Sequence, residues 1–329
     1  MRFLLRMMAI NKDGADMMGK SLSNEYYGGI LILLAMAILG LSDNLFYYLE
    51  PHMGLGQFHA GRSFLSFLLL VPFGLITGAA LMPRRWAPVM GRTVLQTISM
   101  FLYFGSLPLM SVAEAAAGLF TSPIFVLLFT ALIYREKIGA KRIIAVVMGT
   151  IGVFLVLRPD QAGFHIMQAM PVAAGAFYAL ASMTTRRWCA DEPPLAIVGA
   201  FLVVIGLSGA LMTSLLHISP VSQDLYDAAP FFFRGWYAMS LPVWGWTALQ
   251  AAMTLVAIAF LTRAYQVAET SYLAVFEYSL LIFAAGWTYL LFGDTLATSS
   301  IGGFVLIAAA GYVISRALAE PRAEDAQSS

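Results

Sequence analysis

Three ionisable side chains of this sequence lie within long apolar stretches, where a charge is costly. Asp43 stands near the end of the first stretch, Arg62 early in the second, and Glu277 about ten residues into a later one. An ionisable group inside hydrocarbon costs several kcal/mol, so each of the three is a candidate for function. Their chemistry would be the binding of a charged solute or of a coupling proton.

Glu277 is surrounded in the sequence by Tyr272, Phe276 and Tyr278, and two interpretations of it remain open. As a carboxylate it would bind a cation or a proton, because aromatic rings beside a negative charge favour organic cations. Alternatively, burial would keep the acid neutral and bonded to a neighbouring helix.

Asp43 and Arg62 are expected at similar depths, roughly 8–10 Å above the midplane by helical rise. A structural ion pair is the favoured interpretation, and a pair that opens when substrate arrives is the alternative. Asn44, Tyr47 and Tyr48 would extend a polar, aromatic wall beside Asp43.

Further polar and aromatic residues complete the set of candidates. Gln96 and Gln250 would either line the cavity or bond helices together, and Tyr103 and Trp287 offer stacking surfaces. Glu114 and Glu269 lie in first turns, where capping is favoured over ligand contact. The candidate substrate-binding residues are therefore Asp43, Asn44, Tyr47, Arg62, Gln96, Tyr103, Gln250, Phe276, Glu277, Tyr278 and Trp287.

Composition indicates which elements must hold these residues. Of the 329 residues 60% are hydrophobic and 11% are charged, whereas soluble proteins carry roughly a quarter charged residues. This excludes a water-soluble enzyme, and the net charge of +1 excludes a nucleic-acid binder. One cysteine, Cys189, excludes a disulfide framework. No metal or cofactor is expected, since no two of the four histidines, which we interpret as ordinary loop residues, have helical ligand spacing.

About 20 apolar residues are needed to cross a bilayer as a helix, and ten such stretches predict an all-α integral membrane protein. A turn is expected at Pro108–Ser111, followed by a capping box at Ser111–Glu114. The stretches are 28–48, 57–81, 92–110, 112–134, 142–158, 167–187, 195–217, 243–263, 268–292 and 299–318.

The remaining segments are polar or mixed. Residues 1–27 are expected to form a cytoplasmic tail or an interfacial helix, and residues 319–329 a disordered cytoplasmic tail. The aromatic link 218–242 would lie along the headgroup layer, with a substrate-gating lid as the alternative.

Basic residues orient the chain. With both termini in the cytoplasm, sixteen of the nineteen Lys and Arg residues fall inside, Arg92 among them. Only Arg62, Arg158 and Arg234 fall near the outer face. This asymmetry follows the positive-inside rule and supports the number of helices. It places the chain in the inner (plasma) membrane.

The two halves, 28–158 and 167–318, resemble each other at an offset of 154–155 residues. Gly91–Gln96 matches Gly245–Gln250 at four of six positions, and Val112–Glu114 matches Val267–Glu269. Five helices per repeat mean that the second copy enters the membrane from the opposite side. Such inverted repeats are typical of secondary transporters, whose solute site lies near the midplane.

Several motifs resemble the drug/metabolite transporter superfamily, EamA type. One is Arg62 in the second helix, and another is the acidic turn of Tyr134–Ile138 followed by Gly149–Gly152. The second half repeats this pattern of an acidic turn and glycines more weakly, from Phe292 to Gly311. Three segments resemble sequences of the branch that contains S-adenosylmethionine and riboflavin uptake transporters, namely Leu41–Asn44, Gln57 to Arg62 and Phe276–Ser279. Members of that branch often carry a basic residue at the position of Glu277. The resemblance implies ten helices, of which the fifth and tenth lie outside the cavity.

The sequence therefore predicts a secondary carrier for a small organic metabolite, and not an enzyme. Asp43 and Glu277 outnumber the single embedded base, Arg62, which favours a cationic or zwitterionic solute with a methylated or aromatic group. Riboflavin-like or amino-acid solutes, in uptake or export, are the alternative. A membrane-embedded enzyme is disfavoured because no catalytic cluster is found, and a scaffold because it needs no repeat. A homodimer is compatible with this architecture.

Overall fold

The computed structural model describes residues 17–46, 48–106, 118–157, 169–293 and 298–317, and their regular structure is helical. The helices are α2 (Met17–Phe46), η1 (Glu50–His52), α3 (Leu55–Thr77), α4 (Trp86–Ser106), α6 (Ser122–Leu132), α7 (Ala140–Leu157), α8 (Ala169–Trp188), α9 (Pro194–Ile218), α10 (Gln223–Ala228), α11 (Pro230–Phe233), α12 (Leu241–Val267), α13 (Thr270–Glu277), α14 (Ser279–Phe292) and α15 (Thr298–Ala317).

Each of the ten predicted apolar stretches overlaps a described helix, of which α6 covers only Ser122–Leu132 within the stretch 112–134. Two further differences concern α2 and the stretch 268–292. Helix α2 begins at Met17, so that residues 17–27 continue into the first helix instead of forming a separate tail. The stretch 268–292 is divided at Tyr278 into α13 and α14. The turn expected at 108–111 and its capping box lie outside the described residues.

Five of the described helices are long and apolar enough to cross a membrane. They comprise residues 24–46, 55–77, 194–218, 241–267 and 270–291, and two shorter apolar helices cover residues 122–132 and 301–313. Several such helices in one chain indicate a multi-pass membrane protein.

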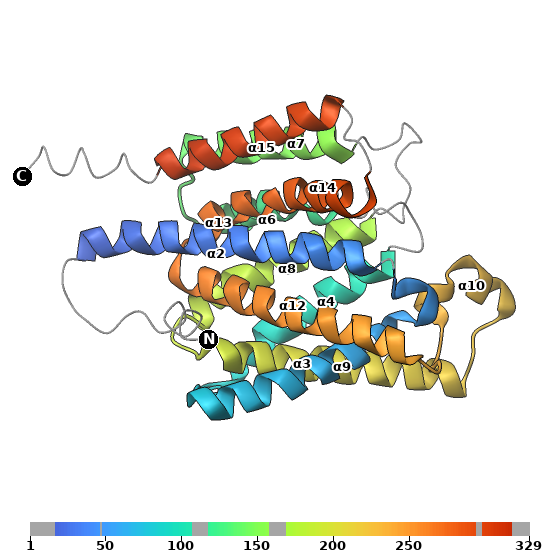
Figure 1. Cartoon of the computed structure of the whole chain (residues 1–329). Helices are drawn as coiled ribbons and strands as arrows, with labels where there is room; N and C mark the ends of the chain where they lie inside the picture. Colours follow the sequence, from blue (N-terminus) through green and yellow to red (C-terminus); the bar gives the residue numbers. More distant parts are fainter. Residues whose placement is uncertain (1–16, 47, 107–117, 158–168, 294–297, 318–329) are drawn as a thin grey trace, which may run out of the picture.

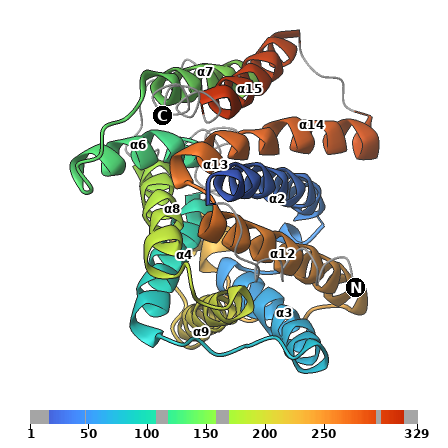
Figure 2. The same ribbon diagram turned by 90° about the vertical axis from the view of Figure 1, so that its left-hand side faces the viewer.

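The helices run side by side, and paired helices form both edges of the molecule (Figures 1 and 2). Helices α7 and α15 pack together at one edge, and α3 crosses α9 at the other. Each contact depends on a glycine. A Cβ atom at Gly152 would lie 2.8 Å from the carbonyl oxygen of Gly303, and one at Gly56 would lie 2.6 Å from that of Gly209. Small residues thus permit close packing of Gly152 on Gly303, whereas Gly302 faces open space.

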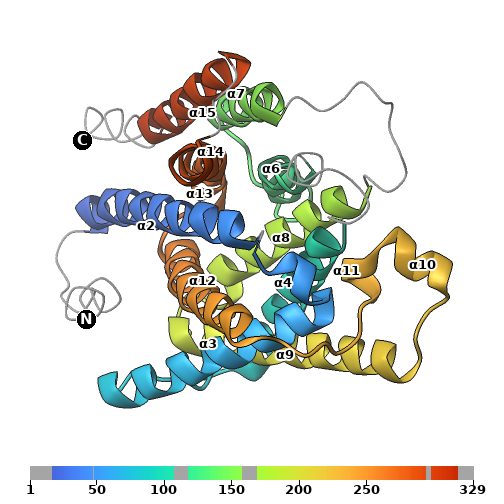
Figure 3. The ribbon, with the colours of Figure 1, turned by 45° about the vertical axis from the view of Figure 1, so that its right-hand side comes forward.

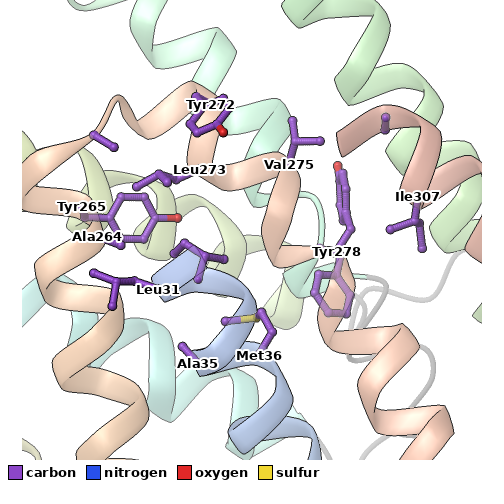
Figure 4. Packing of buried hydrophobic residues seen from close by; sticks show 14 of the residues in the cluster. Leu31, Ala35, Met36, Ala264, Tyr265, Tyr272, Leu273, Val275, Tyr278 and Ile307 are labelled. Atoms are coloured by element: carbon purple, nitrogen blue, oxygen red, sulfur yellow. The ribbon is translucent and has the colours of Figure 1, made fainter. Parts of the chain in front are cut away.

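The largest core cluster joins α2, α12 and α13 to α6, α7, α14 and α15 (Figure 4). Tyr272, Leu273 and Tyr278 are almost completely buried there. Tyr272 and Leu273 lie against Gly29 and Gly28 of α2, whereas Tyr278 lies against α7 and the ring of Phe120. This packing fixes α13, and therefore the position of Glu277 at its end.

Two opposite faces can be distinguished. We call the basic face the one at which α2 begins and α15 ends, on the left in Figure 1, where the junctions α3–α4, α6–α7, α8–α9 and α12–α13 also lie. Helices α10 and α11 lie at the opposite face (Figure 3). There Phe231 is buried in an aromatic cluster, and Gln57 exchanges two hydrogen bonds with the backbone of Tyr237. The link 218–242 is therefore partly packed into the protein instead of lying wholly along the surface.

Candidate functional site

A cavity of about 150 Å³ lies at the centre of the bundle. Its lining comes from α2, α3, α4, α6, α8, α9, α12, α13 and α14 and from the turn before α6, but from neither α7 nor α15. The two helices at the outer edge are thus absent from the described lining, as the resemblance implied. The polar lining residues are Ser42, Asp43, Arg62, Arg92, Gln96, Tyr103, Ser122, Tyr178, Ser182, Thr254, Tyr265 and Glu277.

Glu277 is the last residue of α13 and is held by two tyrosines. The hydroxyls of Tyr178 and Tyr265 donate to its Oε1 atom at 2.5 and 2.7 Å. Among the described residues, no hydrogen bond to Oε2 is found, and no base lies within 4.0 Å of the carboxylate. Glu277 is nevertheless only 5% exposed. Two donors on one oxygen fix the carboxylate and leave the other oxygen available to a ligand.

Asp43 and Arg62 both line the cavity but do not form the expected ion pair. Within the described part of the chain, their charged atoms do not approach to 4.0 Å. Arg62 instead lies with its guanidinium 4.5 Å from the ring centre of Phe58 and with Nη2 3.4 Å from Nδ1 of His59. Aromatic stacking, which suits a planar guanidinium, thus holds Arg62 in place of a carboxylate.

Arg92 is the main site residue that the sequence analysis missed, because it was assigned to the cytoplasmic side. It lines the cavity and is 6% exposed. Its Nε donates to Oγ1 of Thr185 at 3.0 Å, while Nη1 is buried with no hydrogen-bond partner among the described residues. The start of α4 at Trp86 explains the error, since Arg92 lies two turns inside the helix.

The four charged cavity residues change the expected charge balance. Asp43 and Glu277 are matched by Arg62 and Arg92, so two acids face two bases. The excess of acid expected from the sequence is therefore wrong. Tyr178 and Tyr265 were also missed, although a tyrosine in the middle of an apolar stretch is a signal that could have indicated them.

The predicted polar and aromatic residues divide into two groups. Gln96 and Tyr103 line the cavity. In contrast, Gln250 is buried outside it, with Nε2 donating to the carbonyl of Ser42 at 3.3 Å. Asn44 and Trp287 join α2 to α14, through hydrogen bonds to the carbonyl oxygens of Ala284 and Ala37 respectively.

Two further aromatic candidates face away from the cavity, and a third is outside the described residues. Phe276 lines an apolar groove between α2, α13, α14 and α15 and packs edge to face on Tyr272. Tyr278 is fully buried, and its hydroxyl lies 3.1 Å from Oγ1 of Thr150. Tyr47 is not described.

Glu269 does not cap α13 through its own carboxylate, in contrast to the expectation. It stands at the N-cap position without a side-chain cap bond. Its carboxylate instead forms an ion pair with Arg142 and accepts a hydrogen bond from Ser271, while its backbone N–H donates to Glu25. A guanidinium is the stronger partner. Glu114 lies outside the described residues.

His59 also differs from the expectation of an ordinary loop histidine. It is fully buried in α3 beside Arg62, and its Nε2 atom has no hydrogen-bond partner in the described part of the chain. It adds a polar group behind the cavity wall.

The chain is similar to known transporters over most of its length. It is 25% identical to the pseudopaline exporter CntI of Pseudomonas aeruginosa, over 78% of this chain and 84% of that protein. It is 27% identical to a riboflavin transporter of Rhizobium johnstonii, over 76% of this chain and 78% of the relative. It is also 22% identical to an S-adenosylmethionine uptake transporter of Rickettsia prowazekii, over 86% and 90% of the two chains.

The fold has a counterpart among solved structures. One crystal structure superposes with a TM-score of 0.70 at 18% identity, covering 90% of this chain and 99% of that one. Residues 26–158 match the model of the EamA-like transporter family. Over residues 26–158 the chain thus matches the EamA-like transporter family, and the relatives it is similar to are named as metabolite transporters.

Proposed function

We propose that the chain is a secondary carrier that moves a small organic metabolite by alternating access through the central cavity. The observation that carries this proposal is the lining itself. Unpaired charges and polar groups from both halves of the sequence meet inside a bundle of apolar helices. Intramembrane ionisable groups that face a shared cavity are typical of solute pathways.

The helix contacts support ten helices arranged as two inverted five-helix repeats. Exchanging each helix with its counterpart in the other half preserves the main contacts. The contact of α2 with α12 corresponds to that of α8 with α4, and the contact of α2 with α14 to that of α8 with α6. Three further contacts each join a helix to its own counterpart in the other half and are therefore unchanged by the exchange: α3–α9, α7–α15 and α6–α13. Two halves that can exchange roles provide two related states, as alternating access requires.

The basic face would be cytoplasmic, with both termini on that side of the inner membrane. At its helix ends lie five arginines with their hydrogen-bond and ion-pair partners, namely Arg84, Arg85, Arg142, Arg186 and Arg187. The positive-inside rule assigns such a face to the cytoplasm.

The solute would be small and would carry at least one positive charge, with Glu277 and Asp43 as its acceptors and Gln96 and Tyr103 as further contacts. The cavity volume of about 150 Å³ is below the roughly 300–1,000 Å³ that accommodates drug-sized ligands. A riboflavin-like solute is the second candidate, favoured by relatives that are named riboflavin transporters. It would require a wider conformation of the cavity.

Counterflow in proteoliposomes tests the carrier function. Vesicles preloaded with unlabelled amines, amino acids, nucleoside-like compounds or riboflavin should accumulate the matching labelled solute transiently, because a carrier exchanges solute without an energy source. Empty vesicles and a cavity variant, Glu277→Gln, are the controls. If no solute of the panel shows counterflow above these controls, the proposal is wrong.

A further inference from the structure

Arg92 lacks a partner for one end of its charged group. Thr185 accepts from Nε at 3.0 Å, and the ring centre of Phe201 lies 5.9 Å from the guanidinium carbon. Nη1 is buried and has no hydrogen-bond partner in the described residues. A buried donor without an acceptor is costly, more so when it is charged, so this nitrogen indicates that an acceptor enters the cavity.

Glu277, in the same cavity, has one carboxylate oxygen without a hydrogen-bond donor among the described residues. Oε1 is satisfied by Tyr178 and Tyr265, whereas Oε2 accepts no hydrogen bond from the described residues. In the part of the chain that the structure describes, no ion pair joins Glu277 to Arg92. Two opposite charges are therefore held in one small cavity by neutral hydroxyls and kept from neutralising each other. Isolated buried charges are strongly unfavourable unless they are compensated.

We propose that Arg92 and Glu277 together bind the two charged ends of a zwitterionic solute, with the Arg92 guanidinium taking its carboxylate and Glu277 its ammonium group. This inference rests on the proposed carrier function and narrows its substrate class. The planar guanidinium suits a carboxylate, because two N–H groups can donate to its two oxygens in parallel. The apolar remainder of the solute would lie against Met100, Phe120 and Leu280 of the lining.

This arrangement discriminates against solutes with one charge. A purely cationic amine would satisfy Glu277 but would leave Arg92 buried and unpaired. Truncating one partner of a buried charge pair weakens binding by about 30-fold or more. A zwitterion should therefore bind at least about 30-fold more tightly than the same molecule with its carboxylate converted to a carboxamide.

Binding to the purified full-length protein tests the inference with matched probes. The probes are L-methionine, L-phenylalanine and L-tryptophan, each compared with its carboxamide under mildly acidic conditions that keep the amide amine protonated. The wild-type protein should bind at least one acid about 30-fold more tightly than its amide. Arg92→Gln should weaken binding of the acid only, which brings the ratio close to one. Arg92→Lys should retain part of the acid-to-amide affinity ratio, because lysine keeps the positive charge but lacks the two parallel N–H donors of the guanidinium.

Arg186→Gln is the matched control. Arg186 follows Thr185, the partner of Arg92, near the end of α8, but its Nη1 donates to the carbonyl of Gln266 and it is not part of the cavity lining. This variant should keep the wild-type ratio. Should Arg92→Gln fail to fold, Arg92→Lys carries the test, since it must still lower the ratio.

Three results would overturn the inference: amides that bind as tightly as acids, a ratio that survives in Arg92→Gln, or no binding of any acid. Counterflow of amines at rates equal to those of the amino acids would contradict the binding of a zwitterion but not the carrier function. Absence of counterflow for every solute would contradict the carrier function as well.

Discussion

At the scale of single residues, the sequence indicated the acids of the cavity more reliably than the bases. Asp43, Arg62 and Glu277 could be found because each interrupts an apolar stretch, and all three line the cavity. Arg92 could not be separated from the basic residues of the cytoplasmic side, because only the true start of α4 places it inside. Hydrogen-bond partners such as Tyr178 and Tyr265 depend on how distant helices meet, which no local pattern encodes.

Replacing Glu277 by Gln removes the charge that would bind the ammonium group. We expect solute uptake to fall by at least about 30-fold, as for the loss of one member of a buried charge pair. Tyr265→Phe removes one of the two hydrogen bonds and should cost only about fivefold, or ~1 kcal/mol. Uptake is compared at equal expression and equal melting temperature. Normal uptake by Glu277→Gln would remove this residue from the site.

The geometry of Asp43 and Arg62 makes a different prediction. Since no ion pair joins them in the described structure and Arg62 stacks on Phe58 instead, a double charge swap should not rescue either single variant. Transport is measured for Asp43→Arg, Arg62→Asp and the combined variant. Recovery of uptake in the combined variant would show that the two charges pair directly.

At the scale of elements, helix positions could be predicted but helix interruptions could not. Apolar length identified the helices, because a bilayer imposes it. The division between α13 and α14 falls at Tyr278, which is neither glycine nor proline, so no helix-breaking residue predicts it. Interrupted helices are common at the solute sites of secondary transporters. Here the interruption comes directly after Glu277.

Close packing of α7 on α15 is testable at one glycine. A Cβ atom at Gly152 would lie 2.8 Å from a backbone oxygen, which cannot move aside as a side chain can. Gly152→Ala should therefore lower the stability by about 1–3 kcal/mol in detergent, measured by thermal unfolding. Gly302→Ala, which meets open space in the neighbouring helix α15, should be neutral or slightly stabilising. Equal melting temperatures for both variants would contradict this packing.

The contacts of Glu269 tie the basic face together. Arg142 at the start of α7 and Glu25 of α2 both bind this residue between α12 and α13, so elements of the two halves are joined. Asp43, in contrast, lies near the end of α2 toward the opposite face and is exposed. We infer from this combination a carrier that is closed toward the basic face.

Loss of the Arg142–Glu269 ion pair should favour opening at the basic face. In Arg142→Gln we expect a cysteine placed in the cavity, Ser182→Cys, to react about fivefold faster with a thiol reagent added from that side, because a half-exposed pair contributes ~1 kcal/mol. Native Cys189 can remain, since burial raises its pKa to about 11 and few thiolates are present at neutral pH.

Arg234→Gln serves as the control for this experiment. Arg234 binds the carbonyl oxygens of Pro51 and Met53 at the opposite face. It should leave the reaction rate from the basic face unchanged. A rate that is the same in Arg142→Gln and in the wild type would show that this ion pair does not hold the face closed.

At the scale of the whole molecule, the distribution of charge predicts the orientation and the repeat predicts the architecture. Both are properties of the entire chain, and both were visible because lipid forces apolar and basic residues into separate layers. The shape and volume of the cavity were not visible, since they arise from the angles at which the helices cross.

Topology is tested by two exposed acidic residues at opposite faces. Asp191 follows α8 at the basic face, and Asp224 lies in α10 at the other. We expect a membrane-impermeant maleimide to label Asp224→Cys in intact cells, and Asp191→Cys only after permeabilisation. Labelling of both positions in intact cells would exclude the proposed orientation.

The three members of the Glu277 cluster all come from the second half of the sequence, on α8, α12 and α13. Arg92 comes from the first half, on α4. Arg92 is nevertheless bonded to Thr185 of α8, the helix that packs along α4 and also carries Tyr178. A motion that separates α4 and α8 from α12 and α13 would therefore change the spacing between the guanidinium and the carboxylate. The dissociation constant of a bound solute measured from the periplasmic side should then differ from that measured from the cytosolic side.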